Sequence, residues 1–401
     1  MLANLSASPY HAGKLLEREQ LFARRAREHR MAVAYCNLIG GQDELIFDGA
    51  SLVLDARGRR LAQGAQFQED LILVDVSPAQ AGPRRRGAGR AASVRVPGPS
   101  AERPALQLPQ PEPLEPVEEI YEALTLGVRD YVRKNGFSSV VLGLSGGIDS
   151  ALTACIAADA LGATQVMGVV MPSRFSSAKT QEDARRVARA LGIETQEISI
   201  EPIFSACLQT LKPLFGDRPE DLTEQNLQAR IRGLLLMALS NKFGWLVLTT
   251  GNKSEMATGY TTLYGDMAGG FAVIKDVPKT LVYQLARFRN QRGPHRPIPD
   301  SVLKRAPTAE LASHQTDQDT LPPYDVLDRI LKAYVEQDRS LREILAGNRV
   351  EPSMVQQVLR MVDRSEYKRR QGPPGIKITP KAFGKDRRMP ITNRYHQSLD
   401  V

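Results

Sequence analysis

The sequence predicts an α/β protein built around a doubly wound parallel sheet, and three observations favour this class. Short apolar runs alternate with helical patterns through residues 116–401, as is typical of a parallel sheet covered by helices on both faces. Two of the apolar runs end in polar loops, at 142–150 and 249–255, where such sheets bind ligands. With 42% hydrophobic and 24% charged residues, the 401-residue chain has the composition of a globular protein with a sizeable core.

The elements of residues 116–401 follow one another regularly. The first helix is amphipathic and closed by Gly136, and the second ends at Gly162. Because the two polar loops each follow a strand, we expect them to share one site at the carboxyl edge of the sheet. In chain order, the expected elements are a helix at 116–136, a strand at 138–144, a helix at 150–162, a strand at 165–172, a helix at 178–192, a strand at 194–200, a helix at 226–244 and a strand at 245–250.

Two further regions precede this one. Residues 1–78 combine one amphipathic helical pattern at 14–29 with strand-like runs at 32–39, 43–58 and 69–76. Residues 79–115 are rich in Pro, Arg, Gly and Ala, with almost no aromatic or β-branched side chains, which is typical of a linker.

The net charge, the cysteines and the N-terminal residues indicate which binding partners and which cellular compartment to expect. The formal net charge of +8 favours anionic partners, but no aromatic-rich basic motif indicates nucleic acid. Cys36, Cys155 and Cys207 form neither a CxxC pair nor a zinc-binding pattern, so we expect a reducing compartment. The N-terminal residues lack the basic and apolar regions of a signal peptide, and no apolar run has membrane-spanning length. We therefore expect a cytoplasmic protein without a membrane partner.

The glycine-rich stretch LGLSGGIDSALTA, residues 142–154, has several possible functions. It lacks the lysine of a Walker A loop, and its glycines have the wrong spacing for a dinucleotide-binding fingerprint. The segment GLSGG formally matches the GxSxG elbow of serine hydrolases, in which Ser145 would be the nucleophile. Such an enzyme would also need a histidine, and His295 and His314, the histidines available, have no recognisable context.

A fourth interpretation is a loop that holds phosphate. Gly146 and Gly147 allow the backbone to approach an anion closely, and the following helix N-terminus adds partial positive charge. Ser145 and Ser150 can donate hydroxyl hydrogen bonds, while Asp149 is explained if it holds Mg²⁺ that bridges to the phosphates. The alternative without a ligand is a strand-to-helix turn in which Asp149 or Ser150 is the cap.

The segment SGGIDS resembles the pyrophosphate-binding loop of the N-type ATP pyrophosphatases, which activate a carboxyl or carbonyl oxygen with AMP. Four longer blocks resemble one branch of this superfamily, the glutamine-dependent NAD synthetases. The resemblance covers nearly all of 116–401 and is specific, because the blocks occur in order. The blocks are residues 223–241, 248–280, 305–328 and 367–395.

The resemblance implies a two-step reaction. The nicotinate carboxylate of deamido-NAD attacks the α-phosphorus of ATP with loss of pyrophosphate, and ammonia then displaces AMP from the acyl adenylate. Asp149 and Glu255 are implied as catalytic residues that hold Mg²⁺. The residues implied to bind ATP are Gly143, Leu144, Ser145, Gly146, Gly147, Ile148, Asp149, Ser150, Thr250 and Arg305, and those implied to bind deamido-NAD are Asn226, Glu255 and Lys368.

Two further expectations concern the surroundings of this site. Tyr260 and Tyr264 either stack on the nicotinate ring or pack against the sheet. The helix at 226–244 is more apolar than one amphipathic face requires, so we expect a homo-oligomer, at least a dimer, as the resemblance also implies.

The N-terminal region resembles the last portion of the nitrilase-like glutaminase domain that is fused to these synthetases. The resemblance lies in ANLSASPYHAGK, residues 3–14, and in residues 35–58. In the family, a Glu-Lys-Cys triad precedes these segments, so we expect a partial α/β sandwich that lacks its triad. Cys36 is expected to be a buried apolar residue. Ammonia is then the expected nitrogen donor, and a catalytically idle nucleotide-binding subunit is the alternative function.

Overall fold

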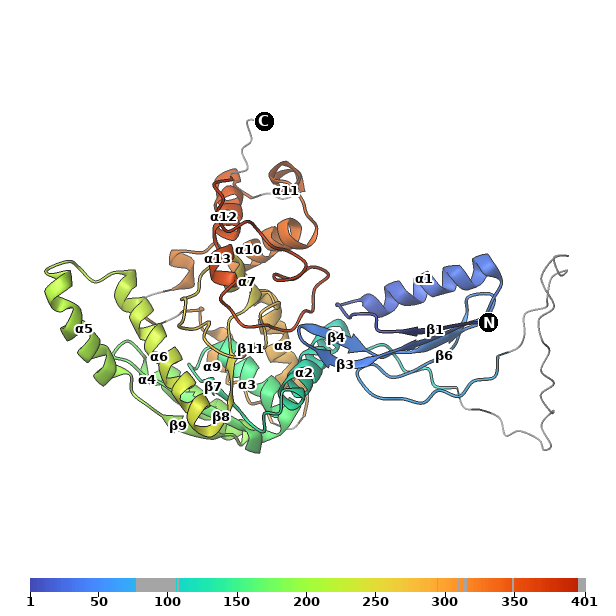
Figure 1. Ribbon diagram of the computed structural model, residues 1–401, viewed down its shortest axis with the longest axis horizontal. Coiled ribbons are helices and arrows are strands. Elements are labelled where there is room, and N and C mark those ends of the chain that lie inside the picture. Colours follow the sequence, from blue (N-terminus) through green and yellow to red (C-terminus); the bar gives the residue numbers. More distant parts are fainter. Residues whose placement is uncertain are drawn as a thin grey trace. The chain divides into compact units, whose positions relative to one another are not determined.

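The computed structural model describes residues 1–76, 106, 108–293, 295–308, 310–312, 316–347 and 350–395 (Figure 1). The chain divides into two compact units. The first comprises residues 1–40 and 47–114, and the second comprises residues 41–46 and 115–401.

The second unit contains the predicted parallel sheet. Its strands are Val- and Leu-rich and almost fully buried in the centre, as expected for a sheet covered on both faces. The strand order is β11-β10-β7-β8-β9, and all four pairings are parallel. The chain enters at central β7 and leaves it in both directions, so the topological switch point lies between β7 and β10. The strands are β7 (Val140–Gly143), β8 (Val166–Val170), β9 (Glu194–Glu197), β10 (Leu246–Thr249) and β11 (Phe271–Ala272).

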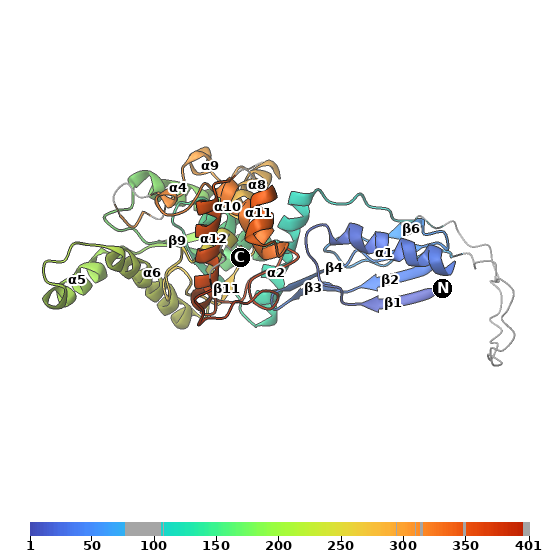
Figure 2. The ribbon, with the colours of Figure 1, turned by 90° about the horizontal axis from the view of Figure 1, so that it is seen from above.

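Helices cover both faces of this sheet, which confirms the predicted doubly wound class. α2, α3 and α8 pack on one another, and α4 packs on α3. Helices α5 and α6 follow one another on the other side of the sheet (Figure 2). Phe204 of α5 and Ile231 and Leu236 of α6 belong to the hydrophobic core that includes Val141 of β7. These helices are α2 (Pro116–Lys134), α3 (Ile148–Leu161), α4 (Ala178–Leu191), α5 (Glu201–Phe215), α6 (Leu222–Phe243) and α8 (Lys279–Gln291).

A helical subdomain follows the sheet and has a hydrophobic core of its own. Leu327, Ile330, Val355 and Val358 belong to this core, which also includes Ala257 of α7. The helices of this subdomain are α7 (Lys253–Thr258), α10 (Tyr324–Leu331), α11 (Leu341–Gly347), α12 (Pro352–Arg364) and α13 (Glu366–Arg369), with a π-helical turn at Lys332–Glu336. The short α9 (Asp300–Lys304) packs on α8, and single 3₁₀ turns lie at Ala163–Gln165, before β8, and at Asp317–Asp319, before α10.

The first unit is a small mixed sheet with one helix. The strand order is β1-β2-β5-β6, with β1 parallel to β2 and the other pairs antiparallel. Helix α1 spans the 14–29 segment predicted from the sequence, and Ala26 packs on Leu52 and Leu54. The elements are β1 (Leu2–Ser6), α1 (Lys14–His29), β2 (Val33–Asn37), β5 (Leu52–Leu54) and β6 (Arg60–Gln63). Strands β3 (Ile39–Gln42) and β4 (Leu45–Asp48) pair with each other, and residues 41–46 of this hairpin belong to the second unit.

Two predictions for this unit are wrong. Residues 69–76 do not form a strand, because β6 occupies the next position in the sheet and the apolar Leu71 is 82% exposed. Cys36 is exposed and not buried, because β2 alternates and places Val33 and Tyr35 in the core. Most of the predicted linker lies outside the described residues, although Gln63 N donates to the carbonyl of Pro109 at its end.

Candidate active site

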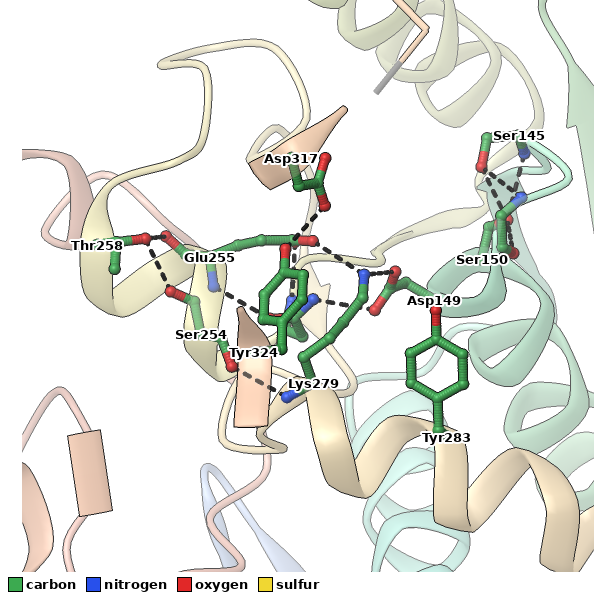
Figure 3. A network of polar contacts seen from close by, with 12 residues as sticks. Ser145, Asp149, Ser150, Ser254, Glu255, Thr258, Lys279, Tyr283, Asp317 and Tyr324 are labelled. Carbon is green, nitrogen blue, oxygen red and sulfur yellow. Dashed lines mark hydrogen bonds and ion pairs between the residues drawn. The ribbon is translucent and has the colours of Figure 1, made fainter. Parts of the chain in front are cut away.

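The glycine-rich loop connects β7 to α3 and is held in shape by its own serines. Ser145 Oγ and Ser150 Oγ lie 3.0 Å apart, Gly147 N donates to Ser145 Oγ, and Ser150 Oγ donates to Gly147 O (Figure 3). Gly146 has a φ of +80°, and a Cβ atom there would collide with the carbonyl oxygen of Thr180. The N-cap of α3 is Gly147, with no side-chain cap, so neither Asp149 nor Ser150 caps the helix.

The two predicted carboxylates meet at a lysine that the sequence analysis did not single out. Lys279 Nζ lies 2.5 Å from Asp149 Oδ2 and 3.4 Å from Glu255 Oε1 (Figure 3). Asn252, which caps α7, also joins the two loops, because its Nδ2 donates to Asp149 Oδ1 over 3.0 Å. The polar loops at the ends of β7 and β10 therefore converge, as predicted.

Glu255 also has a local structural role. It is residue N3 of a capping box, in which its backbone N–H donates to Asn252 Oδ1 and its Oε2 accepts from Asn252 N. This box holds the side chain at the start of α7 while Oε1 turns to Lys279. Glu255 can therefore cap α7 through its backbone N–H and Oε2 while its Oε1 contacts Lys279 at the cavity wall.

The pKa values of Glu255, Lys279 and the nearby Asp317 are shifted by burial and by neighbouring charged groups, Asp149 among them. Burial raises the pKa of Glu255 to about 8, against the attraction of Lys279. Burial alone would lower the pKa of Lys279, but Asp149 and Glu255 raise it overall. Burial also raises the pKa of Asp317, whose Oδ2 accepts a hydrogen bond from Tyr324 over 2.7 Å. Two carboxylates therefore contact the Lys279 ammonium and a third acts on it from further away, so these four groups carry a net negative charge when all three carboxylates are ionised.

A buried carboxylate fixes the two helix starts that carry Glu255 and Lys279. Asp328 of α10 accepts from Ser254 Oγ at 2.5 Å and from Thr280 N and Oγ1 at 2.8 and 2.7 Å. Ser254 Oγ in turn accepts from Lys279 N over 2.9 Å. Asp328 therefore ties α7 and α8 together directly behind the charged cluster.

The loop and the cluster border a cavity of about 310 Å³. Its wall includes residues 143–150, the ends of β8 and β10, part of α6, and single residues from the segments that follow α7 and that include α9, namely Tyr260, Thr261, Gly265, Asp266, Ala268, Val302, Arg305, Ala306, Pro307, Thr308, Glu310 and Leu311. Thr250 and Arg305 belong to the wall, as do Asp149, Glu255 and Lys279. Cavities of this size at the carboxyl edge of a doubly wound sheet are typical small-molecule sites.

Arg305 contacts the loop in an unexpected way. One guanidinium nitrogen donates to the carbonyl of Gly146 over 3.2 Å, and the other pairs with Asp183 of α4. The side chain thus braces the glycine-rich loop against α4, whose first turn includes Thr180.

Asn226 and Lys368 are not part of the cavity wall, but both hold residues 259–262, a segment that borders the cavity. Thr262 Oγ1 donates to Asn226 Oδ1 over 2.8 Å, and Lys368 Nζ donates to the carbonyls of Gly259 and Thr261. Tyr260 of this segment borders the cavity. Tyr264, by contrast, is 66% exposed and has a φ of +61°.

The described residues bear on three other possibilities: a serine hydrolase, a protein-only metal site and a membrane-spanning helix. The polar side-chain partner of Ser145 that the structure records is Ser150, and no histidine hydrogen bond to Ser145 is present in the described chain. Among the described residues, no group of three or more His, Cys, Asp or Glu side chains is arranged to hold a metal. No helix in the described part of the chain is long and apolar enough to cross a membrane.

Comparisons with known proteins identify the family. The NAD synthase family model matches residues 120–372. A glutamine-dependent NAD(+) synthetase of Thermotoga maritima is 52% identical, with 100% of this chain and 71% of that protein aligned. The solved glutamine-dependent NAD+ synthetase from Acinetobacter baumannii, in complex with ADP, is 42% identical with a TM-score of 0.65, covering 99% of this chain and 69% of that one. An NH3-dependent NAD synthetase from Campylobacter jejuni is 28% identical with a TM-score of 0.51, covering 63% of this chain and 96% of that one. The chain therefore belongs to the glutamine-dependent NAD synthetases, a family of ligases.

Proposed function

We propose that this chain converts deamido-NAD to NAD in the cavity beside the glycine-rich loop, with ATP consumed to AMP and pyrophosphate through an acyl adenylate. The observation that carries the proposal is the convergence of Asp149 and Glu255, from two strand ends, on Lys279 at the cavity wall. A carboxylate can attack a polyphosphate only where positive charge offsets both anions.

The glycine-rich loop is proposed to hold the leaving pyrophosphate. The backbone N–H groups around Gly146 and Gly147 and the N-terminus of α3 provide partial positive charge without a bulky side chain. Ser145 supplies a hydroxyl, whereas Ser150 supports the loop through Gly147 O. Thr250 borders the same space and is proposed to contact ATP.

The residues fit a Mg²⁺ ion bound with the nucleotide. Asp149 and Glu255 already direct carboxylate oxygens at a single cation, the ammonium of Lys279. Carboxylate oxygens are the protein ligands that Mg²⁺ prefers, and phosphate oxygens and water complete its usual coordination. When bound, the ion would offset the charge of the phosphates and of the nicotinate carboxylate, while Lys279 keeps the two protein carboxylates together.

Deamido-NAD is proposed to bind beside the segment 259–262. Asn226 and Lys368 hold this segment by hydrogen bonds, and Glu255 borders the cavity from α7. Burial lowers the pKa of Lys368, and Asp266 opposes this change. An anionic dinucleotide beside Lys368 would favour its charged form.

Ammonia is proposed as the direct nitrogen donor of the 401-residue polypeptide. The NH3-dependent relative from Campylobacter jejuni aligns over 96% of its own length, so a chain of that extent has the parts of an ammonia-using synthetase. Of the three cysteines, Cys155 is a poor candidate for glutamine hydrolysis, because burial raises the pKa of its thiol to about 12 and so disfavours the thiolate nucleophile. Glutamine hydrolysis by this polypeptide is proposed to be absent or very slow.

One product assay tests this proposal. Purified protein is given ATP, Mg²⁺ and deamido-NAD, with either ammonium or glutamine as nitrogen source, and NAD, AMP and glutamate are measured together. NAD and AMP in equal amounts with ammonium, and little glutamate with glutamine, are the expected result. Stoichiometric glutamate and NAD would contradict the ammonia proposal, while no NAD with either donor would favour a catalytically idle subunit.

A further inference from the structure

Arg232 extends from α6 to the cavity and is only partly held by the protein. Its Nε donates to the carbonyl of Met171, the residue that follows β8, over 3.1 Å. The side chain is part of the cavity wall. Among the described residues, no hydrogen bond or ion pair involves its two terminal nitrogens.

The other two cations of the described cavity wall are already paired. Lys279 contacts Asp149 and Glu255, and Arg305 contacts Asp183. Burial lowers the pKa of Arg232 to about 10, against the more distant attraction of Glu310. The Glu310 carboxylate itself accepts from Thr180 Oγ1 and Ser177 N. Arg232 is half-buried at the cavity wall, and a guanidinium that makes no ion pair among the described residues there is favoured by an approaching anion.

Arg232 also lies close to the start of the glycine-rich loop. A Cβ atom at Gly143 would lie 3.2 Å from Met171 Cε and 3.7 Å from Leu236 Cδ1. Met171 is the residue whose carbonyl Arg232 binds, and Leu236 lies one helical turn beyond Arg232 on α6. Met171, the residue that Arg232 binds, therefore also lies next to Gly143, and Arg232 and Gly143 border the same cavity. The N–H groups proposed for pyrophosphate lie further along the loop.

We propose that Arg232 binds a phosphate oxygen of the AMP half of the nucleotide, the half that stays with the acyl adenylate. The proposal rests on the proposed function, because it requires that the cavity takes ATP. A guanidinium anchored through Nε presents its two terminal nitrogens as a fork, which matches two oxygens of one phosphate. Binding at this position would supply the missing partner of Arg232 and orient the α-phosphate toward the cluster of Asp149, Glu255 and Lys279.

The test compares ligands that separate the parts of the nucleotide. Affinities for ATP, AMP, adenosine and pyrophosphate are measured by calorimetry or by competition with a fluorescent ATP analogue, for wild type, Arg232→Met and Arg232→Lys. Lys242→Met, an exposed position on the same helix, is the matched control. Arg232→Met is expected to weaken AMP binding about tenfold or more, the loss of a charge-assisted hydrogen bond, with adenosine and pyrophosphate nearly unchanged.

The other possible results contradict either the phosphate contact, its assignment to the AMP half, or the proposed function itself. Unchanged AMP affinity in Arg232→Met, or an equal loss for adenosine, would exclude the phosphate contact, and a loss confined to pyrophosphate would exclude the AMP half. Failure of wild type to bind either ATP or AMP would instead contradict the proposed function. If Arg232→Met does not fold, as judged by circular dichroism, Arg232→Lys decides: it retains the charge without the fork and is expected to bind AMP less tightly than wild type, with adenosine unchanged.

Discussion

Lys279 Nζ lies 2.5 Å from Asp149 Oδ2, although 130 residues separate the two positions in the chain. Asp149 comes from the first turn of α3, and Lys279 is the first residue of α8. Glu255 approaches the same ammonium from α7. A charged cluster assembled from three helix starts is the structural basis of the site proposed here, and the predictions below address its parts.

Asp149→Asn and Glu255→Gln are each expected to lower NAD formation about 10²–10³-fold while the fold is retained. Either change removes a negative charge that would help hold Mg²⁺ against the phosphates. Turnover is measured at saturating Mg²⁺ beside Asp325→Asn, which changes an exposed carboxylate of α10. Near-normal turnover in either site variant would contradict its assignment as a metal ligand.

Lys279→Met is expected to reduce both turnover and stability. The change leaves Asp149 and Glu255 close together without their shared cation, and breaking a buried ion pair in this way typically costs about 3–5 kcal/mol. The free energy of unfolding is measured by denaturant titration, with Lys304→Met, 79% exposed in its own ion pair, as the control. Equal stability of the two variants would show that Lys279 does not hold the carboxylates together.

Ser145→Ala is expected to weaken the use of ATP without blocking a covalent step. Ser145 is proposed to be a hydrogen-bond donor to pyrophosphate, and its recorded side-chain partner is Ser150, which cannot act as a base. The KM for ATP and the turnover number are compared with those of wild type. Detection of an acyl- or phospho-Ser145 adduct by mass spectrometry would overturn this assignment and favour a serine hydrolase.

Asp328→Asn is expected to lower turnover more than it changes the affinity for ATP. Asp328 accepts hydrogen bonds from Ser254 and Thr280 and so sets the positions of α7 and α8, which carry Glu255 and Lys279. The glycine-rich loop does not depend on these bonds, so ATP binding is retained. Asp325→Asn again serves as the control on α10, and a parallel loss of ATP affinity and turnover would indicate a general structural defect instead.

The synthetase region is expected to associate with a second copy of itself through α6. Apolar side chains remain exposed on this helix, as expected from its excess apolar content; they are Leu222 at 63%, Leu234 at 61%, Met237 at 36% and Phe243 at 56%. Leu234→Asp is expected to weaken association, measured by light scattering at micromolar concentration, whereas Leu16→Asp on α1 is not. A monomeric wild-type protein with full activity would count against this prediction.

The regular elements of the second unit could be predicted closely because their causes are local. Alternation of apolar runs with amphipathic segments identified the strands β7, β8 and β10, and glycines at 136 and 162 marked helix ends. In the first unit the same reasoning failed at residues 69–76, because an apolar pattern alone does not determine which segment pairs with the neighbouring strand of the sheet. Strand β6, with less apolar sequence, has that place because it follows β5 directly in an antiparallel pair.

By itself, the sequence determined the fold class, the glycine-rich loop and the meeting of two polar loops at one edge, since these follow from periodicity and from strand direction. Only the tertiary structure decided that Lys279 joins the carboxylates and that Asp328 stands behind them. It also decided that Arg232 borders the cavity with terminal nitrogens that no described residue pairs. A lysine at a helix start or an arginine on a long helix carries no local signal of its partners. Their roles depend on which distant side chains share their desolvated surroundings, and packing of the helices against the sheet sets those surroundings.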